Sequence, residues 1–103
     1  MRMLLKVSIP VEAGNAAAQN GTLGSTIQRI LGELKPEAAY FTEFEGKRTA
    51  VLIVELAEAS QIPALAEPWF LALGARVEFH PAMVVADLQK AAPAIAAAGK
   101  KYG

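Results

Sequence analysis

The chain contains no cysteine, which excludes disulfide bonds, thiolate nucleophiles and cysteine-ligated metals. It has one histidine, too few for a usual zinc site within one chain, although a dimer would double the number. Ten basic residues balance ten acidic ones, so the basic surplus typical of a nucleic-acid binder is missing. No apolar run approaches the ~18 residues of a membrane span, and Lys6 interrupts the apolar start too early for a signal peptide. We therefore expect no metal, no cofactor, no nucleic acid and no membrane contact, and a cytoplasmic location.

Hydrophobic residues are what the sequence has in excess. They make up 53% of the 103 residues, against 19% for charged residues. A chain of this length is expected to form a single domain, residues 1–103, with a core of modest size. Burial of further apolar surface in a partner would add stability, so the composition favours a homodimer.

Two segments show the alternation of half-buried β-strands. Residues 3–10 alternate between apolar and mixed positions, and Pro10 ends the strand because it cannot donate to a ladder. In the second segment, Val77 and Phe79 point to one face. Its polar residues point to the other: Arg76, Glu78 and His80.

Residues 37–58 predict a β-hairpin around Glu45-Gly46, where glycine supplies the positive φ that a tight turn needs. A two-residue loop would pair Phe44 with Lys47 and Glu43 with Arg48. The face that Tyr40 and Thr42 occupy depends on this register and stays open at the level of the sequence.

Helical periodicity appears in three places. The first apolar stripe comprises Leu23, Ile27, Ile30, Leu31 and Leu34. We predict Asn15 as the N-cap of this helix, an irregular first half because of its glycines, and an end at Pro36.

The second helix covers about residues 62–73, with Ser60 as its predicted N-cap and Gly74 at its end. Pro68 is expected to kink or split it. The alanine-rich tail is predicted to be helical up to Pro93 and frayed beyond it. Its narrow apolar stripe, expected to add to dimer packing, comprises Leu88, Ala91, Ala92 and Ile95.

The order of these elements predicts an α+β fold of the ferredoxin-like βαββαβ type, followed by a C-terminal helix. In this plan a four-stranded antiparallel sheet carries its helices on one face, and the first and last strands are neighbours. The other face then has no helix to cover Lys6, Ser8 and the polar side of residues 76–80.

Three blocks of the chain carry a family resemblance: "PEAAYFTEFEGKRTAVLIVEL", "IPALAEPWFLALGARVEFHPAM" and the following "DLQKA". With the predicted plan and length, they resemble the dimeric α+β barrel superfamily, and within it a small bacterial family with no assigned activity. The resemblance implies two chains whose open sheet faces form one barrel. It leaves activity open, because the superfamily includes quinol-type monooxygenases, lactone isomerases, haem enzymes and ligand-sensing modules.

The uncovered face supplies the candidate ligand-binding residues: Lys6, Tyr40, Arg76, Glu78 and His80. His80 would act as a base or hydrogen-bond donor beside Glu78, with Lys6 and Arg76 holding an anion. By resemblance His80 could also ligate haem, but a lone histidine is a poor signal for that. The alternative is that these groups have no binding or catalytic role and pair with one another on a solvated or dimer-facing surface.

Two functions therefore stay open. The first is a homodimeric small-molecule binding or structural module. The second is a cofactor-independent enzyme, monooxygenase- or isomerase-like, acting on a small aromatic or acidic metabolite.

Overall fold

A computed structural model describes all of residues 1–103. In chain order the elements are β1 (Arg2–Ser8), α1 (Val11–Gln19), α2 (Leu23–Leu34), β2 (Ala38–Phe44), β3 (Lys47–Glu55), the 3₁₀ turn η1 (Ala59–Gln61), α3 (Ile62–Leu73), β4 (Arg76–Pro81) and α4 (Val85–Tyr102). The strands form one sheet in the order β2-β3-β1-β4, and every neighbouring pair is antiparallel. The α+β class and the four-stranded antiparallel sheet are confirmed, and the arrangement is compatible with a ferredoxin-like plan.

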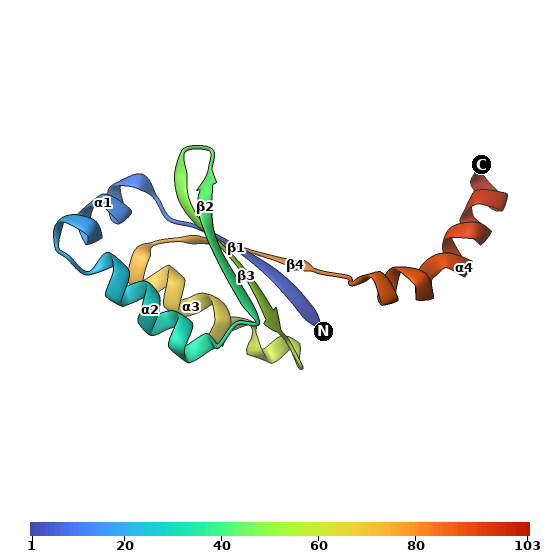
Figure 1. The fold of residues 1–103 in the computed structure, drawn as a ribbon, viewed down its shortest axis with the longest axis horizontal. Coiled ribbons are helices and arrows are strands. Elements are labelled where there is room, and N and C mark those ends of the chain that lie inside the picture. The colour runs from blue at the N-terminus through green and yellow to red at the C-terminus, as the bar shows by residue number, and fades with distance from the viewer.

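The core lies between this sheet and the layer formed by α1, α2 and α3 (Figure 1). Alternate residues of β1 are buried, as the sequence pattern predicts, because successive side chains of a strand point to opposite faces. Leu5 of β1 stands opposite Leu52 of β3, and both side chains are fully buried. Trp69 of α3 is also fully buried, so the only tryptophan is part of the core.

The hairpin has the predicted two-residue loop. Glu45 and Gly46 have φ values of 54° and 75°, the positive pair that a type I′ turn requires. Phe44 is opposite Lys47 and Glu43 is opposite Arg48, which confirms the predicted register. This register also fixes the face of Tyr40 and Thr42: both lie on the side of the sheet away from the helices, opposite Val51 and Thr49.

The first crossover differs from the prediction of a single helix. It contains two helices, α1 and α2, separated near Gly21, whose φ of 73° breaks the helical path. Asn15 is therefore not an N-cap: it lies inside α1, and its Oδ1 accepts a hydrogen bond from Arg48 Nη1 at 3.1 Å. Thr22 occupies the N-cap position of α2.

Ser60 is likewise not the N-cap of α3, because it lies within η1 and Gln61 takes that position. Gln61 Oε1 accepts the backbone N–H groups of Ala57 and Glu58, at 2.9 and 3.1 Å, which orders the approach to the helix. The helix ends as predicted, with Gly74 in the left-handed region at φ 59°.

Neither internal proline ends its helix. α3 continues through Pro68, with Ala66 and Trp69 buried on either side of it. The prediction that the tail frays after Pro93 is wrong, because α4 continues to Tyr102. Its many alanines have the highest helix propensity and outweigh one missing hydrogen bond. Figure 1 shows α4 changing direction midway, as a proline within a helix causes.

The last helix projects away from the rest of the molecule (Figure 1). The chain measures 58 × 28 × 20 Å and its radius of gyration is 17.2 Å. A compact chain of this length would have a radius of about 13 Å. None of the helices combines the length and the hydrophobicity that crossing a bilayer would require.

Candidate functional site

The sheet face away from α1–α3 is built from alternate residues of all four strands. At its centre, Lys6 of β1 has Val51 of β3 on one side and Glu78 of β4 on the other. One step towards the end of β1, Ser8 is flanked in the same way by Thr49 and Arg76. In the opposite direction, His80 stands beside Leu4. The sheet thus brings Lys6, Arg76, Glu78 and His80 onto one face, as the alternation predicts.

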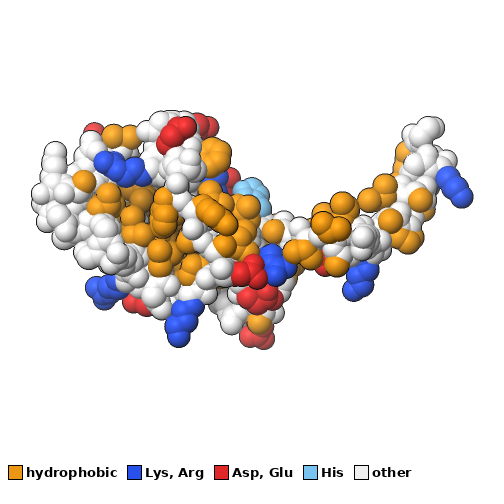
Figure 2. All heavy atoms as spheres, viewed as in Figure 1, with side chains coloured by type: hydrophobic (Ala, Val, Ile, Leu, Met, Phe, Trp, Pro, Cys, Tyr) orange, Lys and Arg blue, Asp and Glu red, His pale blue; other side chains and the backbone are white.

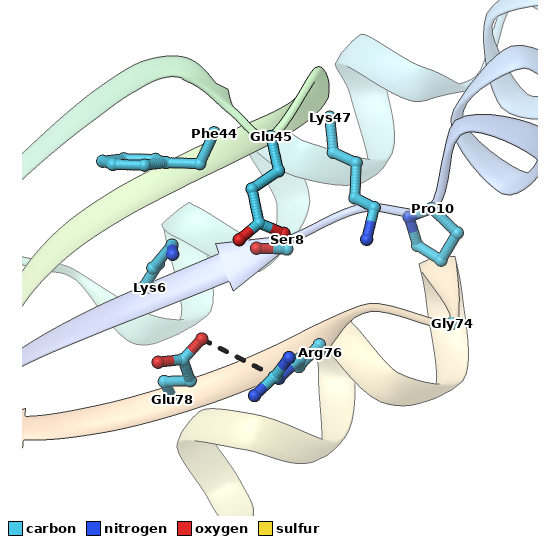
Figure 3. Close-up of a pocket in the computed structure, with 9 residues that line it drawn as sticks. All are labelled: Lys6, Ser8, Pro10, Phe44, Glu45, Lys47, Gly74, Arg76 and Glu78. Atoms are coloured by element: carbon cyan, nitrogen blue, oxygen red, sulfur yellow. Dashed lines mark ion pairs between the residues drawn. The ribbon is translucent and has the colours of Figure 1, made fainter.

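A cavity of about 350 Å³ lies on this face, at the end of the sheet where the hairpin turn overhangs β1 and β4 (Figure 3). Its lining residues come from the ends of these strands and from the loops beside them: Lys6, Ser8, Pro10, Phe44, Glu45, Lys47, Gly74, Arg76 and Glu78. Figure 3 shows the side chains of Glu45 and Lys47 extending from the hairpin towards β1.

The cavity carries an excess of positive charge. Lys6, Lys47 and Arg76 contribute three cations, against the two carboxylates of Glu45 and Glu78. Lys6 Nζ lies 4.4 Å from the centre of the Phe44 ring, a cation–π contact that holds the ammonium group at the cavity wall. The cavity is therefore suited to a small anion, with an aromatic face beside it.

Glu78 connects the cavity to the histidine. One of its oxygens, Oε2, is 3.8 Å from Arg76 Nε, and the other, Oε1, is 3.3 Å from His80 Nε2. The Glu78 side chain is less exposed than either neighbour, at 31% against 80% for Arg76 and 56% for His80. A carboxylate in this position can share a hydrogen bond with the imidazole and orient it.

The structure separates the predicted site residues into two groups. Lys6, Arg76 and Glu78 line the cavity, whereas His80 and Tyr40 lie on the same face outside its wall. Tyr40, on the edge strand β2, is 65% exposed.

Sequence reasoning missed several lining residues. The alternation in β1 and β4 predicts Ser8 on this face but outside the site, and it does not point to Phe44, Glu45 or Lys47. The signal that would have found Phe44 and Lys47 was present: the two-residue turn pairs them, and alternation from the turn puts both on the open face.

The donor set offers little for a metal ion. No group of three or more histidine, cysteine, aspartate or glutamate side chains is placed to hold one, and Glu78 with His80 makes only a pair. Comparison of the chain with known protein families and with curated proteins found no match.

Proposed function

We propose that the chain is a homodimeric module that binds a small anionic or phenolic metabolite on its open sheet face. The observation that carries this proposal is the cavity beside Phe44, in which three cations face two carboxylates on a surface that no helix covers. Charge attraction is stronger in a partly desolvated cavity than in water, so an anion gains more there than on an open surface.

The dimer follows from the apolar residues that share this face with the cations. Tyr40 and Phe44 are 65% and 44% exposed, and Leu4, Val51 and Ile53 are only partly buried between the strands. A contiguous apolar patch of this kind is rare on a monomer. In our proposal two such faces appose, as in a dimeric α+β barrel of ferredoxin-like chains, and each cavity becomes enclosed.

Oligomeric state is the first test. Light scattering coupled to size-exclusion chromatography should give about twice the chain mass of 10.9 kDa. A monomer at micromolar concentration would rule out the apposed sheets and the enclosed site.

Ligand binding is the second test. A thermal-shift screen should use small carboxylates, phenols and hydroxybenzoates as probes, on the wild type, Arg76→Ala and Arg29→Ala. Arg29 is a matched control, because it is an exposed arginine on α2, far from the cavity and paired only with Glu33. We expect a probe to raise the melting temperature of the wild type and of Arg29→Ala but not of Arg76→Ala. Equal shifts in all three would place the binding site elsewhere.

A cofactor-independent enzyme acting on an aromatic or acidic metabolite is the second candidate, favoured by the 3.3 Å contact between His80 and Glu78. An oriented imidazole beside an anion site can take or return a proton. The ligand from the screen would then be consumed by the wild type. His80→Ala would still bind it, because His80 lies outside the cavity wall, but would lose turnover. Loss of binding together with turnover would instead assign His80 to ligand binding.

A further inference from the structure

Helix α4 has an apolar side that nothing in its own chain covers. Figure 2 shows hydrophobic side chains along α4 after it has left the body of the molecule. Leu88 is 50% exposed, Ile95 58% and Tyr102 80%. No residue of α4 is buried. Most helices in proteins are stabilised by packing an apolar side rather than by helix propensity alone.

The large apolar side chains of α4, with small residues between them, share one side of the helix. They are spaced alternately by three and four residues: Val85, Leu88, Ala92, Ile95, Gly99 and Tyr102. With 3.6 residues per turn, Lys90 and Lys101 lie on the side of the helix opposite these residues. Such a stripe, with small residues at Ala92 and Gly99, is typical of a helix that packs closely against another surface.

The body of the molecule has a partly apolar groove beside an exposed phenylalanine. Phe41 of β2 is opposite Ala50 of β3 and points to the same side of the sheet as the helices, yet it is 56% exposed. The groove beside it has a volume of about 320 Å³. Its lining residues come from β2, β3, α2 and the end of β1: Ile9, Ile27, Phe41, Thr42, Arg48, Thr49 and Ala50.

The helix begins at the opposite edge of its own sheet from the groove. α4 follows β4, which is at the opposite edge of the sheet from β2. Three strand spacings separate the two edges, about 14 Å. The link of residues 82–84 spans at most about 10 Å, so α4 begins near the β4 edge, and Figure 1 shows it running away from α2 and α3.

We infer that α4 is an exchanged arm, whose apolar stripe packs into the groove beside Phe41 of a second copy of this chain. The inference rests on the proposed homodimer. When two open faces are apposed, the β4 edge of one sheet can meet the β2 edge of the other. An arm that continues beyond β4 then passes that edge onto the helix side of the partner.

The area of this contact fits a role alongside the sheet contact. An 18-residue helix is about 27 Å long and 10 Å wide, so each arm covers a strip of roughly 270 Å². Two reciprocal arms, counted on both surfaces, bury about 1,100 Å², whereas a stable interface usually buries about 1,600 Å². The arms therefore add to the apposed sheets and do not replace them.

Cysteine cross-linking tests the inference directly, because the natural chain has no cysteine to interfere. We would combine Phe41→Cys with Leu88→Cys, with Ile95→Cys, or with Ala97→Cys as a control on the opposite side of α4. After mild oxidation, at least one of the first two double variants should run as a covalent dimer on a non-reducing gel. The control and all single variants should run as monomers, since disulfides form only when Cα atoms approach within about 7 Å.

Every other result overturns the exchange. A disulfide within one chain would mean that α4 folds back onto its own body. Cross-linking by Ile95→Cys alone would mean that the two arms pair with each other. If the wild type is a dimer and no double variant cross-links, the arm lies elsewhere while the proposed dimer stands. If the wild type is a monomer, the proposed dimer fails as well.

A second measurement does not depend on disulfide geometry. Ile95→Asp should raise the dissociation constant of the dimer at least about tenfold, whereas Ala97→Asp should change it less than about threefold. Neither residue is buried within its own chain, so the fold of the protomer is not at risk. Equal effects of the two substitutions in sedimentation equilibrium would contradict the inferred stripe.

Discussion

Two non-glycine residues, Lys35 and Glu45, have left-handed backbone conformations. Glu45 is the first residue of the hairpin turn, with φ 54°, and its carboxylate also lines the cavity. For an L-residue this conformation costs roughly 1–2 kcal/mol, which asparagine and glycine tolerate better. One side chain therefore weakens both the turn and the attraction of the cavity for anions.

Glu45→Asn should stabilise the protein by about 0.5 kcal/mol, because Asn-Gly is the preferred sequence of a type I′ turn. Glu45→Val should destabilise it, since a β-branched residue fits positive φ poorly. Thermal denaturation of the two variants measures the difference. Similar melting temperatures for both would show that the turn is not strained at this position.

Arg2 and Glu37 form the two-contact ion pair that joins β1 to the residue before β2. Arg2 Nε donates to Glu37 Oε2 at 3.1 Å and Arg2 Nη2 donates to Glu37 Oε1 at 2.9 Å. The hydrogen bonds and the charge of Arg2 lower the pKa of Glu37, and Glu37 in turn raises the pKa of Arg2. Both groups are exposed, so the effect on stability is small and screened by salt.

The sign of the pH dependence follows from the lowered pKa of Glu37. The contribution of the pair is present above about pH 4.3, the ordinary pKa of glutamate, and is lost as the pH falls through the lower folded-state value. Denaturant unfolding measures the free energy of unfolding of both proteins. As the pH falls through that acidic range, Glu37→Gln should lose less stability than the wild type. An identical pH profile for the two proteins would contradict this account.

At the scale of elements, α3 contains two prolines in different positions, so their effects on stability can be compared within one helix. Pro63 lies in the first turn, where its missing N–H has no intrahelical partner in any case. Pro68 lies inside the helix, where it removes a hydrogen bond to the carbonyl of Ala64.

Pro68→Ala should therefore stabilise the protein, by about 1–3 kcal/mol, because the lost helical bond is restored. Pro63→Ala should be neutral or slightly destabilising, since proline is favoured at that position. Urea unfolding compares the two variants. The idea fails if Pro68→Ala is no more stable than the wild type.

The elements that could be predicted are those fixed by local pattern. Alternation fixes which residues of a strand share a face, so Lys6, Arg76 and Glu78 could be placed together without coordinates. The two-residue turn likewise fixed the hairpin register. The N-caps could not be predicted: Asn15, for example, has a long-range partner in Arg48 that the local sequence does not reveal.

Local rules also misjudged the prolines and the position of the cavity. A proline ends a helix only when neither high helix propensity nor burial of its neighbours compensates for the lost hydrogen bond. In α4 the alanines supply the propensity, and in α3 the buried neighbours Ala66 and Trp69 supply the packing. The cavity lies at the hairpin end of the sheet because Glu45 and Lys47 overhang β1 there. That overhang depends on the three-dimensional path of the hairpin, which alternation does not describe.

At the scale of the whole molecule, the protomer is extended, with a body and a projecting arm. Its 58 Å length exceeds its other dimensions at least twofold because α4 packs against nothing in its own chain. The open sheet face and the groove beside Phe41 are the two apolar surfaces that the proposed dimer would cover.

A dimer joined in this way should melt at a temperature that depends on protein concentration, because dissociation accompanies unfolding. A tenfold increase corresponds to about 1.4 kcal/mol, which for two chains of this size raises the melting temperature by about 3–5 °C. Calorimetry over a hundredfold range of concentration measures the slope. A constant melting temperature would show that the chain folds and unfolds alone.

The separation of α4 from its own body also has a kinetic consequence. The sheet and α1–α3 can form within one chain, but in the proposed dimer the arm packs only when a second chain arrives. The last step of folding is then second order, with a half-time that shortens in proportion to the number of chains present, whereas the earlier steps are first order. A newly made chain would wait with an alanine-rich helix loosely formed, and its amide protons there would exchange quickly until the encounter with its partner.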